Sequence, residues 1–182
     1  MTLEAFFEDL IKDQAKVVIN TSKAKPFVEL SEPGQAGCKL KISGIPSDSI
    51  VIKADYFPAP DRIFKGYKSE CKRADYAIIT QKNDNYYVLY VELKSSTESP
   101  SEIENQLKGA RCLIGYCAEI AEHFWGERNI LRSCSHRYAC FTRVNLRKRK
   151  TRIDQQGRND SPASMLKIDS PNYVEFNKLI CT

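Results

Sequence analysis

Asp75, Glu92 and Lys94 are the residues of this sequence whose types and spacing best suit catalysis. Asp75 lies near the start of one β-prone segment, 74–80, while Glu92 and Lys94 lie at the end of the next, 86–93, and just beyond it. A polar stretch between the two segments predicts a β-hairpin, which places Asp75 beside Glu92. Side chains alternate along a strand, so Glu92 and Lys94 project to the same side. We therefore expect two acids and one ammonium group to gather at one end of this hairpin.

Such a group of side chains could bind a divalent metal ion. Two neighbouring carboxylates repel each other, a cation offsets that repulsion, and carboxylate oxygens suit Mg²⁺ or Mn²⁺. We expect Asp75 and Glu92 to bind the ion, with the backbone carbonyl of Leu93 as a candidate further ligand. A metal there can activate water and neutralise charge on a phosphate, while Lys94 would orient the water or stabilise the transition state. The competing interpretation is a structural ion-pair cluster, because charges at a buried strand end must be paired or reach solvent.

An acid followed by an E-x-K triplet on a hairpin, and then by a helix and another strand, resembles the PD-(D/E)xK nuclease superfamily over residues 70–144. The resemblance implies an α/β fold with a restriction-endonuclease-like core, in which helices flank a central mixed β-sheet. It also implies that Asp75 and Glu92 bind metal and that Lys94 serves the hydrolytic step. Ala74 departs from the family pattern, whose name implies a proline before the first acid.

Gln106 is a further candidate catalytic residue, on the helix expected at 99–123. It falls within the apolar stripe of that helix, where an amide needs hydrogen-bond partners. In one branch of the superfamily a glutamine on this helix faces the active site, and the run 104–107 (ENQL) resembles that branch. The tyrosine that often follows has no match, because Tyr116 points away from the stripe. The alternative for Gln106 is a core amide with structural partners.

Basic residues cluster in two places that suit contact with a phosphate backbone. Lys72 and Arg73 come just before Asp75. The second cluster consists of Arg147, Lys148, Arg149, Lys150 and Arg152. Such contacts give salt-dependent and sequence-independent affinity for nucleic acid. The alternative for the second cluster is a solvated loop or a localisation signal.

Together these features predict a metal-dependent nuclease that hydrolyses phosphodiester bonds, with DNA favoured over RNA. A chain of 182 residues has little surface for reading a base sequence, so we expect targeting by homodimerisation or by a partner subunit. An effector or subunit of a defence, restriction or repair system would suit this. The first alternative is a catalytically inactive nuclease-fold module that binds nucleic acid or a protein partner. The second alternative is a cysteine-based enzyme.

The elements that must position these residues follow from hydrophobic periodicity and turn signals. A helical pattern begins at residue 3, within 3–19, and Glu4 on that helix is a candidate extra metal ligand. The N-cap Ser99, Pro100 at the first helical position and Glu102 in a capping box predict the start of the long helix. Strands are expected at 39–43, 49–54, 74–80, 86–93 and 137–144, with a loop that has room for one short strand at 21–37 and an irregular connection at 56–68. A basic loop at about 145–164 and a short strand or helix after 165 complete the expectation.

Length and composition indicate one nuclease-like domain over residues 1–182, with its core at about 38–144. Hydrophobic residues make up 42% and charged residues 28% of the chain, which is ordinary for a globular protein, and the net charge is +5. No apolar run approaches the roughly 20 residues that a membrane span needs, and the N-terminus lacks a signal-peptide pattern. With 7 irregularly spaced cysteines, these features predict a cytoplasmic protein with reduced thiols and no membrane association.

Overall fold

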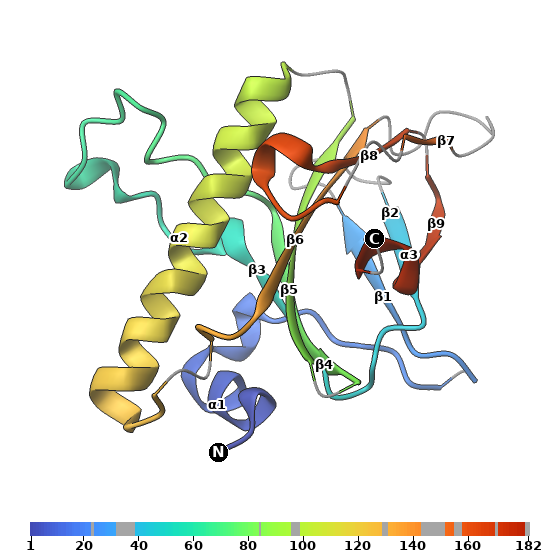
Figure 1. Cartoon of the computed structure of the whole chain (residues 1–182), viewed down its shortest axis with the longest axis horizontal. Helices are drawn as coiled ribbons and strands as arrows, with labels where there is room; N and C mark the ends of the chain where they lie inside the picture. The colour runs from blue at the N-terminus through green and yellow to red at the C-terminus, as the bar shows by residue number, and fades with distance from the viewer. Residues whose placement is uncertain are drawn as a thin grey trace.

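A mixed β-sheet forms the centre of the molecule (Figure 1). The computed structural model describes residues 1–22, 24–31, 39–83, 85–95, 99–128, 131–142, 152–154 (backbone only), 158–169 and 171–180. Within these residues the strand order of the sheet is β3-β4-β5-β6-β8-β7. Its strands are β3 (Ile50–Lys53), β4 (Tyr76–Lys82), β5 (Asn85–Lys94), β6 (Ser135–Thr142), β7 (Arg152–Asp154) and β8 (Leu166–Asp169). β3, β4 and β5 are antiparallel neighbours, β6 and β8 run parallel to β5, and β7 is antiparallel to β8.

A smaller sheet covers one face of the central sheet. It consists of β1 (Phe27–Ser31), β2 (Lys39–Ser43) and β9 (Tyr173–Glu175), in the order β1-β2-β9. Apolar side chains from the two sheets share a core, with Val28 and Leu40 from the smaller sheet and Leu89 and Phe141 from the central one. The short helix α3 (Asn177–Ile180) adds Leu179 to this core.

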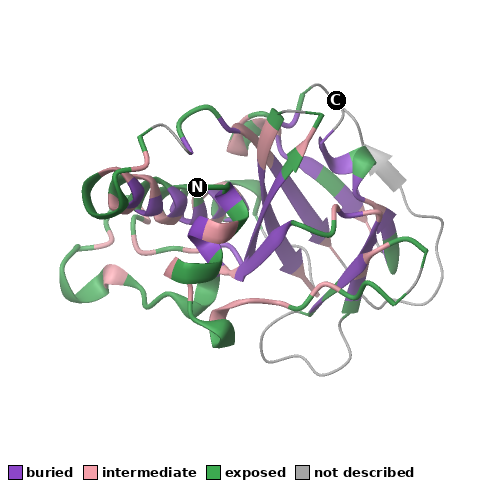
Figure 2. Ribbon diagram, turned by 90° about the horizontal axis from the view of Figure 1, so that it is seen from below, coloured by how far each residue is buried: buried purple, intermediate pink, exposed green. Residues whose placement is uncertain are grey.

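Two helices cover the other face of the central sheet. They are α1 (Leu3–Leu10) and α2 (Pro100–Trp125). Phe6, Leu107 and Ile114 from these helices form a second core with Ala77 and Tyr90 of the sheet. Figure 2 shows the buried positions concentrated in the strands between the layers. The chain is therefore an α/β structure with mixed sheets flanked by helices, which confirms the predicted class at this level. Short 3₁₀ turns complete the described elements: η1 (Asp13–Ala15), η2 (Ala54–Tyr56), η3 (Pro60–Arg62) and η4 (Pro162–Ser164).

The predicted hairpin and long helix are both confirmed. β4 and β5 pair in register from Tyr76↔Val91 to Lys82↔Asn85. α2 provides the crossover that lets β6 run parallel to β5. Its start follows the expected signals, because the Ser99 side chain accepts the Glu102 N–H at 3.3 Å. The second hydrogen bond of the predicted capping box, from the Ser99 N–H to the Glu102 side chain, is wrong. The Glu102 carboxylate binds the Lys72 ammonium group at 3.0 Å instead.

The helical pattern expected to open residues 3–19 is confirmed as α1, which ends at Leu10. After η1 the chain runs extended beside β3, where the Val17 N–H donates to the Val51 carbonyl at 2.8 Å. The β-branched run 17–19 suits this extended conformation. One other expectation is corrected. Within the predicted basic loop 145–164, residues 152–154 form β7 against β8, so the central sheet extends beyond the predicted core limit at 144.

The described part of the chain bears on two further expectations. None of its helices combines the length and the apolar character that crossing a membrane demands. Its cysteines are Cys71, Cys112, Cys117, Cys134 and Cys140, and these described residues form no disulfide. Cys38 and Cys181 lie outside the described residues.

Gly109 allows α2 to lie unusually close to the segment that leads into β4. A Cβ atom at this position would lie 1.8 Å from the Lys72 carbonyl oxygen, which is far inside van der Waals contact. The neighbouring atom belongs to the backbone and cannot rotate away. The helix and the segment before Asp75 are therefore fixed against each other by the absence of a side chain.

Replacing Gly109 by alanine should destabilise the chain by about 1–3 kcal/mol, because the added methyl group forces backbone shifts. Gly115 is a matched control on the same helix, since a Cβ there meets no atom within 4 Å. Gly115→Ala should stabilise by about 0.5–1 kcal/mol through the better helix propensity of alanine. Urea unfolding of both variants checks this, and equal effects of the two substitutions would contradict the close approach.

Candidate active site

Asp75 and Glu92 lie side by side on the face of the sheet that α2 covers. Tyr76 pairs with Val91, so Asp75, which comes just before β4, lies opposite Glu92 of β5. Alternation then places Asp75 and Glu92 on the same face as Tyr90, which is in the core under α2. The Glu92 Oε2 accepts the Asp75 N–H at 3.1 Å, and the Asp75 Oδ2 accepts the Leu93 N–H at 2.7 Å. Each carboxylate is thus held by the backbone of the partner strand.

Lys94 completes the group from the next position on the same face of β5. Its ammonium Nζ lies 2.8 Å from the Glu92 Oε1, and only 12% of its side chain is exposed. Exposure of the two acids is lower still, at 9% for Asp75 and 1% for Glu92. Charges this well buried interact strongly, because little water is present to screen them.

The buried acids disfavour each other's charge. Burial, and then the negative charge of Asp75, raise the pKa of Glu92 from 4.5 to about 8, while the Lys94 ammonium group acts in the opposite direction. Ionisation of Glu92 is therefore unfavourable in this structure unless positive charge is added. A divalent cation between the two carboxylates would supply that charge.

The donor set fits a magnesium-type ion. The described residues contain no cluster of three or more His, Cys, Asp and Glu side chains arranged for metal binding, and the carboxylates brought together here are those of Asp75 and Glu92. Mg²⁺ is commonly held in this manner, through one or two carboxylates together with retained waters and substrate oxygens. Neither thiol nor imidazole is required, so a hard cation suits the site better than zinc.

Gln106 lies on α2 between the two points at which this helix contacts Lys72, namely Glu102 and Gly109. Its side-chain oxygen Oε1 is buried and has no hydrogen-bond partner among the described residues. Buried polar atoms in native proteins are nearly always satisfied, so this oxygen is available to a water or another donor that the described residues do not supply.

Lys72 and Arg73, the basic residues predicted to contact phosphate just before Asp75, have different surroundings. The Arg73 guanidinium donates to the carbonyls of Lys72 at 2.8 Å and Pro58 at 3.3 Å, and it lies 5.5 Å from the ring centre of Phe57. Arg73 therefore fixes a loop to the site region. The Lys72 side chain is 47% exposed and lies next to the start of α2. Residues 147–150, the first four members of the second basic cluster, lie outside the described residues, as does the side chain of Arg152.

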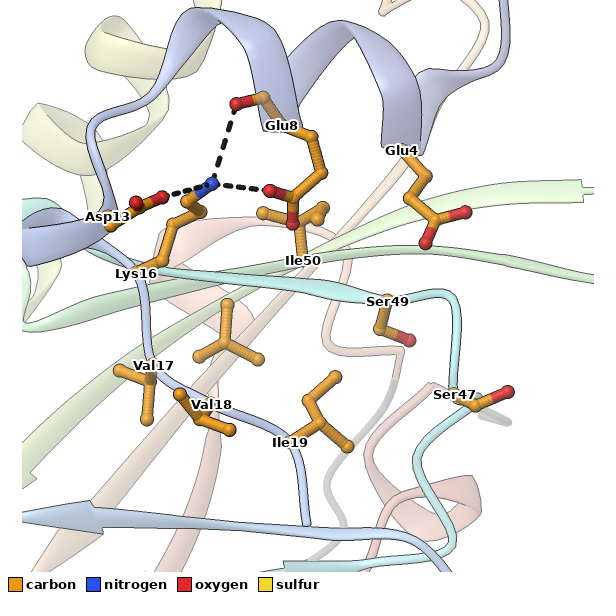
Figure 3. A pocket seen from close by; sticks show the side chains of 11 residues that line it. Glu4, Glu8, Asp13, Lys16, Val17, Val18, Ile19, Ser47, Ser49 and Ile50 are labelled. Atoms are coloured by element: carbon orange, nitrogen blue, oxygen red, sulfur yellow. Dashed lines mark hydrogen bonds and ion pairs between the residues drawn. The ribbon is translucent and has the colours of Figure 1, made fainter. Parts of the chain in front are cut away.

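Glu4 lies away from this site. It lines a pocket of about 350 Å³ near Ser47 and Ser49, where Glu8 and Asp13 both bind Lys16 (Figure 3). This pocket lies at the Ile50 end of β3, which pairs with Ile79, whereas the other end of β3 pairs beside Asp75. The first-helix acid is therefore separated from Asp75 by the length of β4.

Sequence reasoning did not find the residues that β6 and β8 bring to the same edge. Cys140 pairs with both Glu92 and Lys167, and Thr142 pairs with both Lys94 and Asp169. Burial and the charge of Glu92 raise the pKa of the Cys140 thiol to about 12, while the ammonium groups of Lys94 and Lys167 oppose this shift.

Lys167 therefore adds a second ammonium group within electrostatic reach of the site. The alternation in the run LKID at 166–169 was the available signal. Only the strand order of the folded sheet shows that this run lies two strands from Glu92.

Comparison of the chain with protein-family models, with curated proteins and with solved structures finds no match. Its chemistry therefore has to be inferred from its own residues.

Glu92→Gln should change how stability depends on pH in the presence of a chelator. A carboxyl whose pKa rises from 4.5 unfolded to about 8 folded stabilises the fold fully below pH 4.5, and this contribution is lost as pH rises through 8. Relative to the variant, the wild type should be less stable at about pH 8 than at about pH 5, by about 2–4 kcal/mol.

Thermal unfolding at the two pH values measures this difference. Glu29→Gln is the control, because the Glu29 side chain is 52% exposed on the smaller sheet. Parallel pH profiles for wild type and Glu92→Gln would show that the two buried acids are not coupled.

Proposed function

We propose that this chain is a divalent-metal-dependent nuclease with a restriction-endonuclease-like core, which hydrolyses phosphodiester bonds in DNA. The observation that supports this most directly is the Asp75–Glu92 pair. Two buried carboxylates lie side by side at one end of a hairpin, with the Lys94 ammonium group 2.8 Å from Glu92. Their order and placement are those of the D…E-x-K pattern.

In this proposal Asp75 and Glu92 hold the metal ion, and the Leu93 carbonyl is a candidate further ligand. When bound, the ion would activate a ligated water and offset the charge on the scissile phosphate. Lys94 donates hydrogen bonds from a nearly dry position to the attacking water or to a phosphate oxygen, where its charge is poorly screened. Gln106 orients the same water through its buried amide, and Lys167 attracts the phosphate.

Nucleic acid, with DNA favoured, is the proposed substrate because cationic groups lie near the acidic pair. Lys72 is exposed three positions before Asp75, Lys167 is exposed two strands from Glu92, and the sequence contains the additional basic run at 147–152. Charges of this kind bind a phosphate backbone without reading sequence. Targeting would then come from a second copy of the chain or from a partner subunit, as in a defence, restriction or repair assembly.

One observation favours a second candidate function. The Lys94–Glu92 ion pair is already satisfied in the absence of any metal. A nuclease-like fold that has lost catalysis and binds nucleic acid or a protein partner would also retain such a pair for stability. The two functions differ in whether the chain binds Mg²⁺ and requires it for cleavage.

Asp75→Ala, Glu92→Ala and Lys94→Ala should each lower Mg²⁺-dependent cleavage of plasmid and single-stranded DNA by roughly 100-fold or more, because each removes a charge from the reaction centre. The measurement is a digestion panel with Mg²⁺, with Mn²⁺ and with chelator. Lys108→Ala and Glu104→Ala are the matched controls, since they break an ion pair of similar length, 2.7 Å, that lies outside the site on α2.

Thermal shift separates metal binding from catalysis. Mg²⁺ should raise the melting temperature of wild type and Lys94→Ala, but not that of Asp75→Ala, because a ligand stabilises only a chain that binds it. A wild type that cleaves nothing with either metal, or an Asp75→Ala chain that cleaves normally, would overturn the nuclease proposal.

A further inference from the structure

A long loop leaves the central sheet and returns to it at Asp75. This aromatic loop, residues 55–74, connects β3 to β4, and in Figure 1 it projects past α2 (teal). The Ala54 N–H donates to the Asp75 carbonyl at 2.8 Å, so both ends of the loop meet at the candidate active site. Connections longer than about 12–15 residues are uncommon in compact domains and often serve a function.

The aromatic loop exposes large apolar side chains that a stable fold would normally bury. Tyr67 is 81%, Tyr56 58% and Phe64 51% exposed, and Ile63 is 79% exposed. Residues 57–63 also line an open hollow with a mostly apolar wall. Gathered exposure of this kind marks an interaction surface, whereas scattered apolar residues are ordinary.

Basic side chains alternate with these aromatic residues along the loop. Arg62, Lys65 and Lys68 fall among them, and the Lys65 ammonium group lies 5.7 Å from the centre of the Tyr67 ring. The Glu70 carboxylate is occupied within the loop, because it accepts the N–H groups of Gly66 at 2.9 Å and Lys68 at 2.8 Å. The loop therefore carries exposed aromatic residues together with an excess of basic over acidic residues, the other two acids being Asp55 and Asp61.

Contacts at its base hold the aromatic loop in place beside the site. The Arg73 guanidinium donates to the Pro58 carbonyl at 3.3 Å and lies over the Phe57 ring. The ring centres of Phe57 and Tyr116, the latter on α2, are 6.4 Å apart. The Cys71 thiol contacts the Phe64 carbonyl at 3.8 Å. A surface organised before binding loses less entropy when a ligand is bound.

We infer that the aromatic loop binds single-stranded DNA by stacking Phe64 and Tyr67 on bases while Arg62, Lys65 and Lys68 contact phosphates. This inference rests on the proposed nuclease function and specifies its substrate as DNA with unpaired bases near the cut. Bases in a duplex are stacked on each other, so only a single strand presents its faces to aromatic side chains. The strand would then reach Asp75 directly, because the loop ends there.

The chemistry of the loop favours this occupant over a protein partner. Protein interfaces are depleted in lysine at their centres, whereas this surface alternates lysine with aromatic residues. RNA presents the same phosphates and the same kind of stacking bases, and DNA is assigned here because the proposed nuclease acts on DNA.

The test is binding of a fluorescent thymidine oligomer of about 20 nucleotides, measured by anisotropy in chelator so that no cleavage occurs. The double variant Phe64→Ala/Tyr67→Ala should bind roughly 30-fold more weakly or worse, because it removes two stacking surfaces. Phe124→Ala is the matched control, since Phe124 is 83% exposed near the far end of α2. Tyr67→Trp should retain binding, because indole also stacks. A uridine oligomer and a duplex of equal length should bind more weakly than the thymidine oligomer.

The outcomes separate this inference from the nuclease proposal. If the double variant loses oligomer binding and the wild type cleaves nothing with Mg²⁺, the binding role of the aromatic loop is supported and the nuclease proposal is overturned. Normal oligomer binding by the double variant overturns the inference even if the wild type cleaves DNA. Equal or tighter binding of the RNA oligomer overturns the assignment to DNA. A change in self-association by sedimentation, with oligomer binding intact, would assign the loop to a protein interface and also overturn the inference.

Discussion

The pairing of two buried carboxylates beneath α2 is the constraint around which this fold is arranged. Asp75 and Glu92 each accept a backbone N–H from the opposite side of the hairpin, at 2.7 and 3.1 Å respectively, and the Lys94 ammonium group lies against Glu92. Buried charge is unfavourable unless such partners hold it. The apolar clusters on both faces of the central sheet provide the stability that tolerates it. A site of this kind requires strands fixed by packing on both sides, which is what the two layers supply.

The topology explains why so many polar groups meet at one sheet edge. β5, β6 and β8 are parallel, so their carboxyl ends lie together and present Lys94, Thr142 and Asp169 in register. Ligands of α/β sheets bind at that edge. β4 runs the other way and therefore contributes its first residues to the same edge, which is where Asp75 lies. The close approach at Gly109 then fixes α2 over the segment before Asp75.

Local signals in the sequence were sufficient for the hairpin and for α2, because alternation and capping act between near neighbours. Alternation and hairpin pairing alone place Asp75, Glu92 and Lys94 on one face. Contacts between distant segments were not accessible in this way. Lys167 joins the site only through strand order, and the glycine at 109 matters only because Lys72 lies against it. The same limit applies to residues 17–19, whose extended conformation depends on their pairing with β3. The aromatic loop was expected only as an irregular connection, since no periodicity distinguishes an exposed aromatic from a buried one.

The balance of charge in the site is what the proposed metal ion would change. Glu92 already lies 2.8 Å from the Lys94 ammonium group. Burial and the negative charge of Asp75 raise the pKa of Glu92, so the second acid works against the charged form of the first. Asp75 has a structural partner of its own, because its carboxylate accepts the Leu93 N–H at 2.7 Å. In the proposed function a bound cation would add positive charge and favour the charged forms of both acids at once.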